Sequence, residues 1–103
     1  MAFNGDEGKQ VTLTEASAWT ENYRNANPTE IKAHFFGINK INSVLQQTGV
    51  MGIRFYYGQE DNGTRNLILV GTDANENDMT TGIILETGIP CPSKCGVVNE
   101  LNS

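Results

Sequence analysis

The feature that most constrains this chain is a pair of strand-forming runs joined by a turn signal. Residues 51–58 (MGIRFYYG) are rich in strand formers, and residues 66–71 (NLILVG) form an almost continuous apolar run. The connection between them, residues 59–64, contains Asn62-Gly63, the dipeptide most typical of a tight hairpin. The sequence therefore predicts an antiparallel β-hairpin in the second half of the chain.

A third strand is expected at residues 81–86 (TGIILE), after a polar turn over residues 72–79. Three strands joined in this way form an antiparallel meander. Successive side chains of a strand point to opposite faces, so the first strand has two distinct faces. One face carries Met51, Ile53, Phe55 and Tyr57, and the other carries Gly52, Arg54 and Tyr56.

The first half of the chain carries helix signals. Thr12 followed three residues later by Glu15 is a capping box, and the apolar spacing behind it predicts a helix over residues 13–25. A third helix, over residues 38–47, is expected to end at Thr48-Gly49.

Between these two helices the pattern is ambiguous. Asn27 and Pro28 suit the N-cap and the first position of a helix, whereas Ile31, Ala33 and Phe35 alternate as a strand would. We favour a short second helix that ends before Gly37, because of the caps.

At 103 residues, with 38% hydrophobic residues, the chain is long enough to form one domain with its own core. Residues 1–10 are expected to be a loose N-terminal arm, and residues 11–103 a single α+β domain. In that domain two or three N-terminal helices pack on one face of the three-stranded antiparallel meander. An irregular C-terminal tail with prolines and cysteines follows.

The net charge of −5 argues against nucleic acid or an anionic membrane surface as a partner, because both require a basic patch. No apolar run approaches the roughly 18 residues of a membrane span. No leader is visible at the start of the sequence, which predicts a cytoplasmic address. We predict no cofactor, no nucleic-acid partner and no membrane association.

The tail holds both cysteines, Cys91 and Cys95, in the stretch IPCPSKCG. A redox pair is typically Cys-x-x-Cys at a helix N-terminus, but here the spacing is longer and no helix is predicted. A zinc site needs about four ligands, and the only histidine is His34. Cys91, Cys95 and His34 are therefore candidates for a metal site, while a local disulfide or packed thiols in a proline-stiffened tail is the favoured interpretation. His34 itself is more typical of a partly buried structural histidine.

The turn over residues 73–78 resembles the start of a calcium loop, with candidate ligands Asp73, Asn75, Asn77 and Asp78. An EF-hand is excluded, because Asp78 stands where that loop needs glycine and Ile84 where it needs glutamate. A different, weak cation site stays open. The favoured alternative is a polar turn whose Asx side chains bond the backbone.

Arginine and tyrosine are enriched in interface anchors, which makes Arg54, Tyr56 and Tyr57 candidates for an interface or ligand surface. If the helices cover the opposite face, Arg54 and Tyr56 lie on the uncovered one. The alternative is an arginine stem packed along aromatic surface, with no partner.

Several short motifs occur together: GIRFYYG at residues 52–58, LVGTDAN at 69–75 with Asn77-Asp78, and PCPSKC at 90–95. NYR at residues 22–24, with Pro28, and HFFG at 34–37 accompany them. In these motifs the chain resembles a group of small bacterial proteins of uncharacterised function. The resemblance implies a self-contained cytoplasmic domain, and it implies no catalytic or binding residue.

The sequence contains no phosphate loop, dinucleotide fingerprint or nucleophile elbow, so we do not predict an enzyme. The first hypothesis is a small non-enzymatic interaction or scaffold domain that forms a homodimer, through a sheet edge or the surface of Arg54 and Tyr56. The alternative is a metal- or thiol-dependent small-molecule binder or enzyme that uses Cys91, Cys95 and His34. It requires the histidine to lie beside the thiols.

Overall fold

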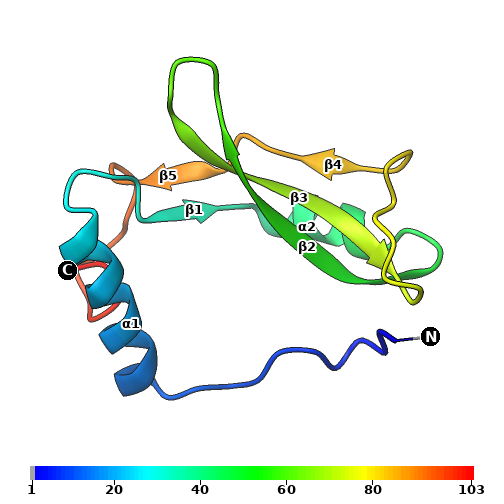
Figure 1. Ribbon diagram of the computed structural model, residues 1–103, viewed down its shortest axis with the longest axis horizontal. Coiled ribbons are helices and arrows are strands. Elements are labelled where there is room, and N and C mark those ends of the chain that lie inside the picture. Colours follow the sequence, from blue (N-terminus) through cyan, green and yellow to red (C-terminus); the bar gives the residue numbers. More distant parts are fainter. Residues whose placement is uncertain (1) are drawn as a thin grey trace. The chain divides into compact units, whose positions relative to one another are not determined.

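The computed structural model describes residues 2–103, which form two compact units (Figure 1). The first unit contains the N-terminal residues up to Glu7 together with Phe36–Gly88, and the second contains Gly8–Phe35 and Ile89–Ser103. Each unit has one helix and one antiparallel sheet, so the α+β class is confirmed. A single domain over residues 11–103 stays a prediction. Within residues 2–103, neither helix has the length and hydropathy needed to span a membrane.

The sheet of the first unit is the expected three-stranded meander. Its strands are β2 (Val50–Gln59), β3 (Arg65–Asp73) and β4 (Ile84–Leu85), in the order β2-β3-β4. The hairpin between β2 and β3 closes through a bond from the Glu60 N–H to the Thr64 carbonyl, 2.8 Å long. Gly63 in this turn has φ of 90°, a conformation that favours glycine.

The strand β4 is shorter than the expected 81–86. The Ile83 N–H donates to Oε1 of Gln47 over 2.8 Å instead of joining the ladder. Only Ile84 and Leu85 pair with β3.

The helix α2 (Ile38–Leu45) packs against β2 and β3 (Figure 1). Its apolar stripe buries Val44 completely, and Leu69 of β3 is equally buried. A Cβ at Gly71 would lie 2.9 Å from Nε2 of Gln47, just after α2. Gly71 and Leu69 are two residues apart and so share a sheet face, which is therefore the face toward the end of α2.

The second unit contains α1 (Leu13–Ala26), β1 (Ala33–Phe35) and β5 (Ile89–Cys91). The capping box that predicted α1 is present, because the Glu15 N–H donates to Oγ1 of Thr12 over 3.1 Å. The two strands pair antiparallel, so the tail is less irregular than expected.

The second helix that we favoured after Pro28 is wrong, because β1 lies there instead. The reason is the role of Asn27, which ends α1 rather than starting a new helix. Its backbone N–H and its side-chain Nδ2 both donate to the Tyr23 carbonyl, at 2.8 and 3.1 Å. The alternation of Ile31, Ala33 and Phe35, which is typical of a strand, agrees with β1.

Candidate functional site

A polar cluster forms where β2 passes the turn after β3. Nη1 of Arg54 lies 2.6 Å from Oδ1 of Asp78, and the Tyr56 hydroxyl donates to Oδ2 of the same carboxylate. The Thr72 hydroxyl donates to Oδ1 over 3.2 Å. Both oxygens of Asp78 are therefore bound by groups of this chain. Arg54 and Tyr56 lie on one sheet face, as expected, but the guanidinium is already engaged.

These contacts stabilise the charged forms of both partners. The Tyr56 hydrogen bond, and then the attraction of Arg54, hold the pKa of Asp78 below its usual range. An interaction of Arg54 itself with the Tyr56 side chain, and then the charge of Asp78, raise the pKa of Arg54. The Arg54 and Asp78 side chains are 34% and 18% exposed, so the cluster is only partly open to solvent.

The depressed pKa of Asp78 predicts a loss of stability in acid. The carboxyl titrates near pH 3.9 in an unfolded chain, and lower in the folded protein. Its stabilising contribution is thus complete above the unfolded pKa and is lost as the pH falls through the folded one. We expect urea unfolding to show a steeper acid loss for the native chain than for Asp78→Asn. Parallel pH profiles would contradict this prediction, since Glu7 and Glu86, whose pKa values are also lowered, are present in both proteins.

The turn over residues 73–78 is organised by its own hydrogen bonds. Oδ1 of Asp73 accepts the backbone N–H groups of Asn75 and Asn77, at 2.9 and 3.0 Å. Asp78 is engaged with Arg54 as described above. Because these bonds occupy oxygens that a cation would need, the geometry favours the polar turn over a cation site. Across residues 2–103, no three acidic, histidine or cysteine side chains form a group that could hold a metal ion.

Cys91 and Cys95 form a disulfide, with their Cα atoms 4.9 Å apart. In the β1–β5 ladder Ala33 lies opposite Cys91, and His34 lies opposite Pro90. Neighbouring residues of a strand point to opposite faces, so the His34 side chain leaves the ribbon on the face away from Cys91. The histidine and the thiols are thus close along the backbone but are not assembled into one site.

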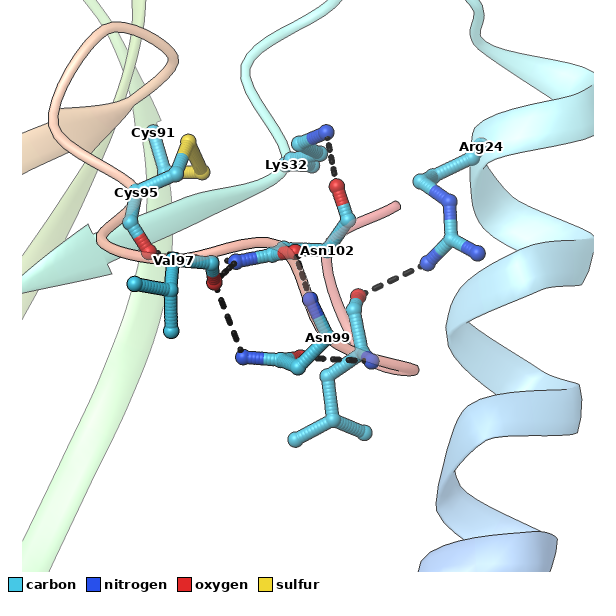
Figure 2. Close-up of a disulfide and its surroundings, with 8 residues drawn as sticks. Arg24, Lys32, Cys91, Cys95, Val97, Asn99 and Asn102 are labelled. Atoms are coloured by element: carbon cyan, nitrogen blue, oxygen red, sulfur yellow. Dashed lines mark hydrogen bonds between the residues drawn. A yellow bond between two sulfur atoms is a disulfide. The ribbon is translucent and has the colours of Figure 1, made fainter.

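The C-terminal residues fold back onto this unit through a hub at Asn102 (Figure 2). Its Nδ2 donates to the carbonyls of Cys95 and Val97, at 3.1 and 3.2 Å, and its Oδ1 accepts the Asn99 N–H over 2.8 Å. Arg24 of α1 donates to the Leu101 carbonyl over 2.7 Å. The cysteine stretch is thus part of a hydrogen-bonded clasp, formed by the disulfide and residues 97–103.

The outer edge of β2 is unpaired within residues 2–103. Among the described residues, β3 is the only strand that pairs with β2. Three aromatic side chains of β2 are exposed, with Phe55 at 54%, Tyr56 at 45% and Tyr57 at 94% of their surface. Tyr57, one of the expected surface residues, is thus almost fully open to solvent.

Two partners of Arg54 were missed in the sequence. Phe3 places its ring centroid 5.8 Å from Cζ of Arg54, and its N–H donates to the Ala74 carbonyl over 3.3 Å. A lone aromatic residue in a polar arm was the available signal for this contact. The sequence predicts Asp78 in a polar turn, with a weak cation site as the alternative, and does not predict its contact with Arg54, although the predicted meander brings that turn beside the strand of Arg54.

Comparison with known proteins found no similar protein. The chain matches no protein-family model, and no curated protein or solved structure is detectably similar to it. The resemblance to small bacterial proteins stays a prediction.

Proposed function

We propose that this protein is a small non-enzymatic interaction domain that forms a homodimer through the outer edge of β2. The observation that carries the proposal is the edge itself. It spans ten residues, it is paired on one side only, and it has three exposed aromatic side chains. A strand with a free edge is a template for pairing with another chain.

The devices that normally protect a sheet edge are missing from most of β2. Such edges are typically short, twisted away by a bulge, or marked by proline or lysine. The other edge strand, β4, has only two residues and meets this description. In β2 the register shift lies between Val50 and Gly52, and the remaining residues pair regularly with β3 as far as Gln59. This stretch contains neither proline nor lysine.

The charge on β2 does not oppose self-association. Arg54 is the only charged residue of the strand, and its guanidinium is paired with Asp78. A second copy would thus meet a neutralised pair rather than a bare cation. The ligand-surface alternative for Arg54 is weakened by the same contact, because the guanidinium already has its carboxylate.

No observation favours the alternative of a metal- or thiol-dependent binder. Its cysteines are joined to each other, and His34 points off the opposite face of the ribbon from Cys91. The cytoplasmic address stays a prediction, and the disulfide weighs against it, because disulfides persist mainly in oxidising compartments.

The test is the oligomeric state in solution, measured by sedimentation velocity over a wide concentration range. We expect the native chain to dimerise, and Tyr57→Lys to raise the dissociation constant by about tenfold or more, because an edge lysine opposes strand pairing. Val97→Lys is the matched control, since Val97 is 85% exposed and lies in the second unit. A monomeric native chain, or equal effects of both substitutions, would overturn the proposal.

A further inference from the structure

We infer that two copies of β2 pair antiparallel about a two-fold axis that passes through Phe55. This inference rests on the proposed dimer and adds its register. A two-fold interface must be self-complementary, because the same surface is used by both copies. The register of the pairing therefore has to bring together residues of one strand that fit each other.

The sequence of β2 is nearly symmetric about Phe55. In an antiparallel pair centred there, Gly52 faces Gly58, Ile53 faces Tyr57 and Arg54 faces Tyr56 of the second copy. Two glycines meet without side chains, an aliphatic residue meets an aromatic one, and a cation meets an aromatic ring. Aliphatic–aromatic cross-strand pairs and cation–aromatic contacts are each stabilising.

This register requires the backbone N–H and C=O groups of Phe55 to point away from β3. Glu60 bonds to Thr64 across the hairpin, so the backbone groups of Glu60 point toward β3. Along a strand these groups alternate between the two sides, and the pairing of β2 with β3 is regular from Gly52 to Gln59. Counting back from Glu60, the N–H and C=O of Phe55 therefore point away from β3. A residue with outward groups can form a doubly hydrogen-bonded pair with its own copy on the axis.

Neighbouring registers fit less well. A pair centred on Arg54 would place Gly52 opposite Tyr56 and Ile53 opposite Phe55, so the facing glycines and the Arg54–Tyr56 pairs of the Phe55 register would be lost. A pair centred on Tyr57 would leave fewer residues of β2 in the ladder. The Phe55 register keeps the long overlap and separates the two Arg54–Asp78 pairs by the axis.

This pairing accounts for the exposed aromatic residues. It would join two three-stranded sheets into one continuous antiparallel sheet. Phe55 would pack against its own copy, and Tyr57 against Ile53 of the other copy. The exposed Phe55 and Tyr57 side chains would then lie within the dimer interface.

Cysteine cross-linking under mild oxidation tests the register. Opposite residues of a hydrogen-bonded pair have Cα atoms about 5.5 Å apart, within the range that a disulfide spans. Phe55→Cys is therefore expected to form a covalent dimer. Tyr57→Cys alone is not, because two copies of residue 57 would lie about 14 Å apart. A mixture of Ile53→Cys and Tyr57→Cys is expected to cross-link as well, and it keeps Phe55 in place.

The outcomes separate the register from the dimer. The native chain is the background control, because its two cysteines are joined within one copy. A native chain that sediments as a monomer overturns the proposed function and this register together. A native dimer in which Tyr57→Cys cross-links alone, or in which the mixed pair does not, overturns only the register. Covalent dimers from both Phe55→Cys and the mixed pair support it.

Discussion

Replacing Gly82 with alanine is expected to lower the free energy of unfolding of the first unit by about 0.5–1.5 kcal/mol, the usual contribution of one hydrogen bond, because it displaces the Gln47 side chain from the Ile83 N–H. A Cβ at Gly82 would lie 2.3 Å from Oε1 of Gln47 and 3.3 Å from the Met79 carbonyl oxygen. Real Cβ atoms do not approach other atoms so closely, so the Gln47 side chain has to move. The expected loss comes from the bonds that this movement breaks.

Both the oxygen and the nitrogen of the Gln47 side-chain amide form hydrogen bonds. Its Oε1 accepts the Ile83 N–H over 2.8 Å, and its Nε2 donates to the Val44 carbonyl over 3.0 Å. On its other side lies Gly71, where a Cβ would be 2.9 Å from Nε2. The amide thus lies between two glycines and connects the end of α2 to the segment before β4. Moving it leaves the Ile83 N–H without its acceptor.

A double-mutant cycle isolates this contact. In a Gln47→Ala background the clashing atoms are gone, so the further change Gly82→Ala is expected to cost much less than it does in the native chain. Gly52→Ala is the matched control, because nothing lies within 4 Å of a Cβ built there. We would measure urea unfolding of each variant, with amide exchange of the buried Leu69 as a local probe. Equal losses for Gly82→Ala and Gly52→Ala would contradict the prediction.

The elements that the sequence predicted correctly are those with local signals. The hairpin of β2 and β3 follows from strand-forming runs on both sides of Asn62-Gly63, and all of these lie within one short segment. The start of α1 follows from Thr12 and Glu15, which bind each other over a single helical turn. Such interactions depend on neighbours in the chain and can be inferred without knowing the fold.

The errors arose where a distant segment decides the structure. Residues 33–35 form a strand because residues 89–91 pair with them, and no local pattern reveals that partner. Asn27 is equally suited to begin or to end a helix, so its cap signal was ambiguous. The same limit applies to the candidate site. Arg54 and Asp78 were both singled out, but their pairing depends on how the turn after β3 folds beside β2.

The second large effect is expected at Asn102, where the change Asn102→Asp should open the C-terminal clasp. Aspartate keeps an oxygen that can accept the Asn99 N–H, but it loses the two N–H donations to the carbonyls of Cys95 and Val97. It also places a negative charge against those two carbonyl oxygens. The bond to the Cys95 carbonyl is partly buried and the bond to the Val97 carbonyl is exposed, so the loss is expected to come mainly from the first and to be about 1 kcal/mol. The disulfide to Cys91 fixes the segment only at Cys95. No other disulfide replaces the lost hydrogen bonds of residues 97–103.

Hydrogen exchange measures the opening directly. The Leu101 N–H donates to Oδ1 of Asn99 over 2.8 Å within the clasp, and we expect its exchange to become much faster in Asn102→Asp. Asn22→Asp is the matched control, because it adds the same charge to an exposed position of α1 in the same unit. Exchange at Leu69, in the first unit, should be unchanged in both variants. Should Leu101 remain as protected in Asn102→Asp as in the control, the Asn102 side chain is not the hub of the clasp. The disulfide and the donations of Arg24 and Lys32 to the Leu101 and Asn102 carbonyls would then hold residues 97–103 without it.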